Sequence, residues 1–227
     1  MKFTESQYER KMNMNILVVG ANGQIGKHLV SKIQDTNEHT AIAMVRKEDQ
    51  ISQFESQGAK TALVDLEGSV DDIAAAAKDA DAVVFTAGSG GHTGADKTMM
   101  IDLDGAIKTM EAAKQAGVKR FVIVSAIGVH HRDKWMGSVP YYSAAKHYAD
   151  VWLRESDLDY TIIRPGGLIN DAGTGKIKVA VDLERGSIPR EDVATTILAT
   201  LEDDDTIGKE FDMIAGETPI KDAIAKL

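Results

Sequence analysis

The sequence predicts a doubly wound α/β fold with a largely parallel sheet and a small C-terminal lobe. Short apolar runs rich in Val and Ile alternate with longer stretches of helical period, which is typical of strand–helix–strand units. A glycine-rich turn joins the first apolar run to the first helical stretch. The chain has 227 residues, of which 43% are hydrophobic, so one large domain can bury a sufficient core.

Apolar runs and helical stretches alternate along most of the chain. The main sheet is expected to contain strands at 16–19, 41–45, 61–64, 82–85, 121–124 and 160–163. Helices are expected at 25–33, 52–57, 69–78, 95–116 and 140–155. In the first helix, four apolar residues share one face, which would pack on the sheet.

Single residues justify several of these boundaries. Ser69 is a favoured N-cap residue, and Gly117 can adopt the left-handed conformation that ends a helix. Pro140 suits the first turn of a helix. The sixth strand is expected to stop at Arg164-Pro165, because proline cannot continue a hydrogen-bonded ladder.

The two ends of the chain are less regular than the middle. Residues 1–13 are predicted to be a polar leader, and a single domain is expected over 14–227. From about residue 167 the alternation weakens, and the remaining residues are expected to form a lobe packed on the main sheet. Its predicted elements are strand 176–181, helix 190–201, strand 210–214 and a terminal helix after Pro219.

Composition excludes several classes of function. The 26 Lys and Arg against 35 Asp and Glu give a net charge of −9, and no basic stripe is visible, so nucleic acid is not an expected partner. Cysteine is absent, so any redox chemistry must come from a bound cofactor. The sequence shows neither a signal peptide nor the run of about 20 apolar residues that spans a membrane, so we expect a cytoplasmic protein without a membrane partner.

The glycine-rich turn carries the strongest functional signal. Gly20, Gly23 and Gly26 lie between the first strand and the first helix, at the spacing of Rossmann dinucleotide-binding folds. The first two permit a tight turn close to a pyrophosphate, and the third lets the helix pack against the strand. The free N–H groups of the helix start attract negative charge. A plain strand–helix turn is the alternative. The predicted cofactor contacts in this segment are Gly20, Asn22, Gly23, Gln24, Ile25 and Gly26.

The end of the second predicted strand distinguishes the two dinucleotides. NAD-binding proteins usually carry an acidic residue there for the ribose 2′-hydroxyl, whereas this chain has Arg46 followed by Lys47. An Arg side chain can pair with a 2′-phosphate, so NADP is expected rather than NAD. A solvated surface pair is the alternative. Asp65, with Leu66 beside it, is predicted to bind the adenine, although a turn carboxylate is an equal interpretation of Asp65.

Tyr142 and Lys146 form the candidate proton-transfer pair. Their spacing of four residues places them on one face of the predicted helix 140–155. A neighbouring ammonium would lower the tyrosine pKa from about 10 toward neutral pH, as a general acid for carbonyl reduction requires. A surface contact between a cation and an aromatic ring is the alternative.

Together these features resemble the short-chain dehydrogenase/reductase superfamily, in its atypical branch related to the NmrA-like and biliverdin/flavin reductase proteins and to the epimerase/dehydratase family. The resemblance covers nearly the whole chain from Met14. Its carriers are the three glycines, the pair Tyr142 and Lys146, and the segments 113–122, 159–166 and 190–194.

The resemblance implies further site residues. Ala87-Gly88 would lie under the dinucleotide and Pro165-Gly166 beside the nicotinamide. The Tyr-Lys pair would handle proton transfer and the ribose hydroxyls, so that Lys146 also binds the cofactor.

One departure from the family concerns the end of the fifth predicted strand. Active relatives commonly carry two hydroxyl residues there, the second of which orients the substrate carbonyl, and this chain has Ser125-Ala126. Ser125 is therefore predicted to orient the substrate. If it does not, the loss of one such donor can cost about 10²–10³ in rate.

The loop at 126–139 is expected to select the substrate because it precedes the candidate catalytic helix. It contains His130, His131 and Asp133, which could suggest a metal cluster. Adjacent ligands on a loop are poorly spaced for one tetrahedral ion, and no further His or Cys joins them, so no metal is expected.

The sequence thus predicts an NADP-dependent oxidoreductase that transfers hydride to a small carbonyl, quinone or flavin-like substrate. A non-catalytic NADP-binding redox sensor is the alternative from another class. A sugar epimerase or dehydratase is a lesser alternative, because about 60 residues after 167 are few for a nucleotide-sugar domain. The expected partner is a small molecule, and the chain is expected to be a monomer or a homodimer.

Overall fold

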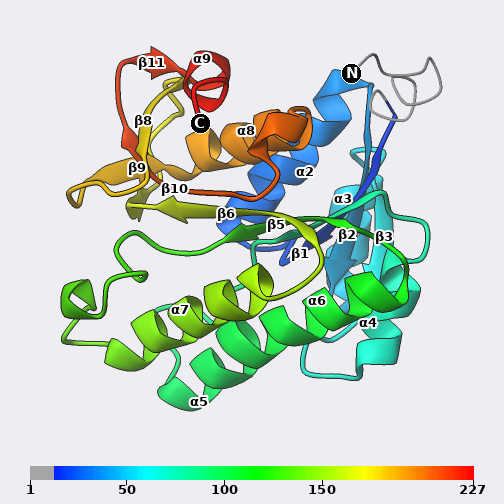
Figure 1. Cartoon of the computed structure of the whole chain (residues 1–227). Helices are drawn as coiled ribbons and strands as arrows, with labels where there is room; N and C mark the ends of the chain where they lie inside the picture. Colours follow the sequence, from blue (N-terminus) through cyan, green and yellow to red (C-terminus); the bar gives the residue numbers. More distant parts are fainter. Residues whose placement is uncertain (1–12) are drawn as a thin grey trace.

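A computed structural model describes residues 13–227; all but the last residue of the predicted leader lie outside them. Within these residues, the main sheet has nine strands in the order β11-β8-β10-β6-β5-β4-β1-β2-β3 (Figure 1). The strands are β1 Asn15–Val19, β2 Thr40–Val45, β3 Lys60–Leu63, β4 Ala82–Phe85, β5 Arg120–Val124, β6 Asp159–Pro165, β8 Lys176–Ala180, β10 Lys209–Ala215 and β11 Thr218–Pro219. Strands β1 to β6 and β10 are parallel, which confirms the predicted doubly wound fold.

Helices cover both faces of the sheet. Their bounds are α2 Gln24–Thr36, α3 Ile51–Glu55, α4 Val70–Ala77, α5 Ala95–Lys97, α6 Gly105–Gln115, α7 Pro140–Arg154, α8 Arg190–Leu201 and α9 Ile220–Ile224. Figure 1 shows α2 and α8 over one face, and α4, α6 and α7 over the other. Because side chains alternate along a strand, Ile16 and Val18 join the core under α2, while Leu17 and Val19 join the second core.

The predicted capping residues act as expected. The Ser69 hydroxyl accepts the Asp72 N–H at 3.1 Å and begins α4. Gly117 has a φ of 78°, and the Val118 N–H reaches the Ala113 carbonyl, so α6 ends in a left-handed turn. Pro140 occupies the first turn of α7.

Two predicted boundaries were wrong. Strand β6 includes Arg164 and Pro165, and Pro165 is paired in register with Met213 of β10. Proline is tolerated because β5 pairs with β6 only as far as Ile163, so no strand residue of β5 needs a hydrogen bond from the nitrogen of Pro165. The Pro165 carbonyl still accepts the Ile127 N–H. The predicted helix 95–116 is three segments, since a π-helical stretch at Thr98–Asp104 separates α5 from α6. Such stretches are frequent at functional sites.

The residues after 167 complete the main sheet. Strand β10 pairs with β6, and β8 runs antiparallel between β10 and β11. Strands β7 (Gly167–Ile169) and β9 (Ser187–Pro189) form a separate two-stranded sheet. Among residues 13–227 no helix combines the length and the apolar character needed to cross a membrane.

One buried carboxylate organises the turn before β8. Asp192, at the start of α8, is 1% exposed. Its two oxygens accept the N–H groups of Thr174 and Gly175 and the Thr174 hydroxyl, at 2.8–3.1 Å. Segment 190–194, one of the carriers of the family resemblance, therefore has a structural task.

Candidate active site

The glycine turn has the tight geometry that the sequence predicts. Gly20 has a φ of 87°, and its carbonyl accepts the Gly23 N–H at 2.9 Å. A Cβ atom on Gly26 would lie 2.3 Å from the Gly20 carbonyl oxygen, so only glycine lets α2 start this close to β1.

The start of α2 fits the phosphates of a dinucleotide. Gly23 is the N-cap and supplies no side-chain hydrogen bond. The N–H groups at the start of a helix have no acceptor within the helix and favour an anion. Asn22 and Gln24 are exposed, whereas the Ile25 side chain is buried in the core, which leaves its backbone for a ligand.

The ends of β1 and β4 meet beside this turn. A Cβ atom on Gly20 would lie 2.6 Å from the Ala87 nitrogen, so the two backbones are in contact. Gly88 is exposed, and a Cβ atom there would lie 3.1 Å from Asp102 Oδ1. The predicted residues Gly20, Ala87 and Gly88 thus lie together where the strand order reverses.

The residues predicted to bind the adenosine half follow β2 and β3. Arg46 is exposed directly after β2. Asp65 is exposed, and its Oδ1 accepts the Glu67 N–H at 3.0 Å, as a turn carboxylate does. Leu66 is buried and packs on Gly105 at the start of α6.

A carboxylate that the sequence interpretation missed lies in the π-helical stretch. Asp102 is 1% exposed, and its Oδ1 lies 3.4 Å from Lys146 Nζ. Its Oδ2 accepts the Ser89 N–H at 3.0 Å. Asp102 therefore joins the glycine-rich loop after β4 to the predicted Tyr-Lys pair on α7.

Lys146 is buried between these elements. Its ammonium also donates to the Val124 carbonyl at 3.2 Å, at the end of β5. Burial lowers the pKa of Lys146, but the charges of Asp102 and Tyr142 outweigh burial and raise the pKa above its ordinary value. The ammonium is therefore charged at neutral pH. These two contacts within residues 13–227 use two of the three N–H donors of the ammonium.

The pKa of Tyr142 moves in the direction opposite to the sequence prediction. Burial raises the pKa of the phenol and outweighs the lowering by the positive charge of Lys146. Two buried carboxylates, Asp102 and Asp150, cancel part of the effect of that charge. The phenol is thus protonated at neutral pH, which is the form that donates a proton.

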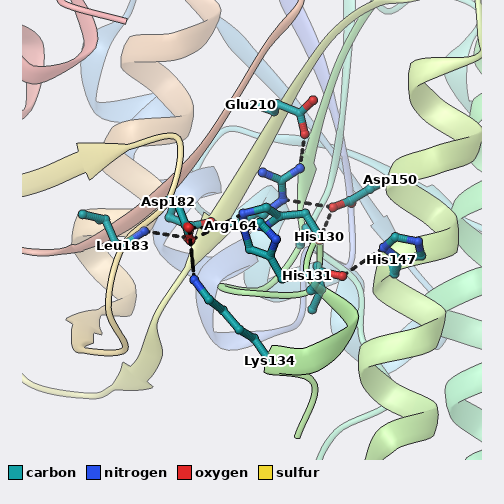
Figure 2. Close-up of polar contacts among 12 residues, drawn as sticks. His130, His131, Lys134, His147, Asp150, Arg164, Asp182, Leu183 and Glu210 are labelled. Atoms are coloured by element: carbon teal, nitrogen blue, oxygen red, sulfur yellow. Dashed lines mark hydrogen bonds and ion pairs between the residues drawn. The ribbon is translucent and has the colours of Figure 1, made fainter.

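Ser125 belongs to a buried ionic network under β6. Its hydroxyl donates to Asp150 Oδ2 at 2.9 Å. Arg164 Nε donates to the same oxygen at 3.2 Å, and its Nη2 pairs with Glu210 (Figure 2). The Ser125 proton therefore points to the protein rather than toward a substrate. Burial raises the pKa of Asp150 against the opposing charge of Arg164.

The predicted Pro165-Gly166 segment is packed tightly. Both residues are buried. A Cβ atom on Gly166 would lie 2.3 Å from the Gly186 carbonyl oxygen, so glycine is needed here for backbone packing, whatever else the segment contacts.

The loop at 126–139 folds against α7. Trp135 Nε1 donates to the Val129 carbonyl at 2.9 Å, and His147 of α7 contacts the same oxygen. The structure places Asp182, rather than Asp133, beside His130 and His131.

The comparisons with known proteins agree with this geometry. A family model described as NAD(P)H-binding matches residues 20–204. YhfK of Bacillus subtilis (strain 168), an uncharacterized sugar epimerase, is 54% identical over 94% of this chain and 100% of its own.

Solved structures and a partial relative extend the likeness. A putative NAD-dependent epimerase/dehydratase from Bacillus halodurans is 43% identical, with a TM-score of 0.89 over 94% of this chain and 100% of that chain. The oxidoreductase ylbE from Lactococcus lactis is 35% identical, with a TM-score of 0.86 over 94% and 96%. Sanguinarine reductase of Eschscholzia californica is 33% identical over 50% of this chain and 44% of its own. The chain therefore belongs to the NAD(P)H-binding family, within the atypical, NmrA-like branch of the short-chain dehydrogenase/reductase superfamily.

Proposed function

We propose that this protein is an NADP-dependent oxidoreductase that transfers hydride between the nicotinamide and a small carbonyl, quinone or flavin-like molecule. The observation that carries the proposal is the half-buried Tyr142 on the same helix as the buried Lys146, whose ammonium pairs with the buried Asp102 next to the glycine loop after β4. The names of ylbE and of sanguinarine reductase, an oxidoreductase and a reductase, support the reaction class.

Several chain segments would hold the dinucleotide. The N–H groups at the start of α2 would bind the pyrophosphate. Arg46 would pair with the 2′-phosphate, which is the basis for preferring NADP to NAD. Asp65 and Leu66 would contact the adenine. Ala87-Gly88 would lie under the dinucleotide and Pro165-Gly166 beside the nicotinamide, as in the family.

Tyr142 would act as the proton donor. The bound dinucleotide supplies the hydride. The neutral phenol donates its proton to the substrate oxygen in the direction of reduction. Lys146 then stabilises the phenolate by its charge, and Asp102 holds the ammonium in place. Ser125 would orient the substrate only if its hydroxyl turns away from Asp150.

The test follows hydride transfer directly. NADPH deuterated on the nicotinamide is mixed with a panel of aldehydes, quinones and flavins, and absorbance decay and deuterium in the product are recorded. We expect transfer to at least one class, with NADPH preferred to NADH, and its loss in Tyr142→Phe but not in Tyr141→Phe. Equal turnover in Tyr142→Phe would refute the assigned role. Isomerised sugar nucleotide with tightly retained cofactor would instead point to the epimerase chemistry that the name of YhfK suggests.

A non-catalytic NADP sensor is the second candidate function. Two features favour it: the Ser125 proton is committed to Asp150, and Ala126 supplies no second hydroxyl. Calorimetry would show NADPH binding without turnover across the panel, together with a partner protein captured only in one redox state of the cofactor. Robust turnover would eliminate this candidate.

A further inference from the structure

Two neighbouring histidines and a carboxylate from a distant segment converge on one point. His130 and His131 follow β5, and their ring centroids lie 4.1 Å apart. Asp182 comes from the connection between β8 and β9. His131 Nε2 lies 3.2 Å from Asp182 Oδ2, and His130 Nε2 lies 3.7 Å from Asp182 Oδ1. Donor atoms of the three residues all lie within 4.8 Å of one another, so the adjacency of the two histidines, which argues against a metal in the sequence, does not keep their ring nitrogens apart.

Among residues 13–227, His130 finds no hydrogen-bond partner at either ring nitrogen, although its side chain is only 14% exposed. Its Nδ1 faces Asp212 Oδ1 of β10 at 3.9 Å, and this oxygen is also buried and unpartnered. The other oxygen of Asp212 is fixed by the Leu183 N–H at 3.1 Å. Buried polar atoms without partners are rare. Here they are the two ring nitrogens of His130 and the Asp212 oxygen that faces one of them.

We propose that His130 Nε2, His131 Nε2 and the Asp182 carboxylate bind a divalent transition-metal ion of the zinc class, with Asp212 holding His130 in the ligating tautomer. Imidazole and carboxylate are preferred ligands of such ions. A ligating His commonly donates its other N–H to a carboxylate, and Asp212 is placed to accept it. One ion would therefore give partners to both nitrogens of His130 and, through the ring, to Asp212 Oδ1.

The Lys134 ammonium lies where the ion would contact Asp182. Its ammonium donates to both oxygens of Asp182, at 2.8 and 3.0 Å (Figure 2). A metal ion would displace this ammonium from the carboxylate, so metal and Lys134 compete for Asp182. Three protein ligands leave one tetrahedral position for water.

The site would join two separate segments. The histidines belong to the loop at 126–139, and Asp182 belongs to the connection 181–186, whose Arg185 already donates to the Lys134 carbonyl at 2.6 Å. A bound ion would fix the loop that is expected to select the substrate. The proposal does not depend on the oxidoreductase function, because it rests on ligand geometry alone.

The second histidine and carboxylate cluster lacks this chemistry. His39 lies near Glu38 and Glu202. However, His39 Nδ1 accepts the Met14 N–H at 3.3 Å, which places the ring proton on Nε2, the atom that faces Glu202. That nitrogen therefore cannot ligate a metal without breaking the contact to Met14. The His39 cluster is thus a comparison site that should not bind the metal.

The test is calorimetric titration of the full chain with ZnCl2 after removal of metals with a chelator. We expect one saturable site, lost in His131→Gln and in Asp182→Asn. Both side chains are about two-fifths exposed, so these changes leave the core intact. His92→Gln, at an exposed loop histidine, is the control and should bind as wild type.

Two further variants test the arrangement around the ligands. Asp212→Asn should weaken zinc binding by about 10–100-fold, as expected when the carboxylate partner of a ligating His is lost. Lys134→Met should bind zinc more tightly, because it removes the competing ammonium. The absence of a saturable site, unchanged binding in His131→Gln and Asp182→Asn, or unchanged binding in Lys134→Met would overturn the proposal.

Discussion

Lys146 Nζ lies 3.4 Å from Asp102 Oδ1, and both side chains are almost completely buried. The pair connects helix α7, which carries Tyr142, to the π-helical stretch between α5 and α6. The same carboxylate holds the Ser89 N–H, so the loop after β4 and the candidate proton donor share one anchor. The position of the phenol is therefore linked to the position of the glycine loop.

Replacing Asp102 by Asn should destabilise the protein. The change leaves a buried ammonium without its counter-charge, which costs about 3 kcal/mol. Because the pKa of Lys146 is raised, the variant should lose this full amount of unfolding free energy at any pH below 10.5, the ordinary lysine value. The difference from wild type should shrink as the pH rises through the raised pKa. Urea unfolding across this pH range measures it. Asp104→Asn, whose carboxylate pairs with Lys108 near the surface, should change stability far less; equal losses in both variants would contradict the assignment.

The phenol of Tyr142 should ionise late in the apoprotein. Burial raises its pKa above the ordinary 10.0, against the effect of Lys146. Ultraviolet titration of the tyrosines should show a transition above that value, absent in Tyr142→Phe and retained in Tyr141→Phe. A transition below 10.0 that disappears in Tyr142→Phe would show that Lys146 outweighs burial.

Arg46→Ala should weaken NADPH binding by about 10–100-fold, which corresponds to one lost charge-assisted contact. Binding of NADH should be unaffected, because NADH has no 2′-phosphate. Fluorescence titration with both dinucleotides measures the difference. Lys78→Ala removes the same charge at the end of α4 and serves as the control. If Arg46→Ala weakened both dinucleotides equally, Arg46 would not be the 2′-phosphate contact.

Gly26→Ala should disrupt the turn before α2. The added Cβ would meet the Gly20 carbonyl oxygen at 2.3 Å and Ala21 Cα at 2.7 Å. Such overpacking typically costs about 1–3 kcal/mol, and dinucleotide binding should fall with it. Gly91→Ala is the matched control, because among residues 13–227 no atom beyond its two chain neighbours lies within 4 Å of its added Cβ. Chemical denaturation and NADPH titration of both variants test this, and normal NADPH binding by Gly26→Ala would count against the turn as the phosphate site.

Arg164→Met should cost about 3–5 kcal/mol, because it leaves the buried Asp150 carboxylate without its ion-pair partner. Lys119→Met also breaks an ion pair, with Asp157, but at the surface, where little change is expected. Denaturant unfolding compares the two. Similar stability of both variants would mean that the network under β6 contributes no more than a surface pair.

The sequence predicts the largely parallel sheet and most element bounds because local signals coincide with tertiary ones. Apolar runs, a capping Ser69 and a terminating Gly117 each act within a few residues. The predicted end of β6 at Pro165 is wrong because a proline breaks a ladder only where the neighbouring strand needs its N–H. Strand β5 pairs with β6 only as far as Ile163. The π-helical stretch at 98–104 is invisible to helical periodicity, which it alters only by a widened turn.

The features of the candidate site also divide into those that local sequence predicts and those that depend on the fold. The glycine turn is local, and its geometry is as predicted. Asp102 lies on a buried face with Thr98 and Ala106, whereas Met99 and Met100 are exposed, so the apolar pattern of the sequence contains no signal for this carboxylate. The raised pKa of Tyr142 and the contact of Ser125 with Asp150 depend on burial and on residues far along the chain. The meeting of Asp182 with the two histidines likewise requires the fold.

The carboxylate of Asp192 has a consequence for motion. The turn at 173–175 lies on the surface, yet its amides at Thr174 and Gly175 are bound to a side chain that is itself buried in the core. Those amides should therefore exchange slowly with solvent, unlike those of ordinary surface turns. A segment restrained in this way should not swing over a bound ligand, so the 173–175 turn is expected to keep its place whether or not the dinucleotide is bound.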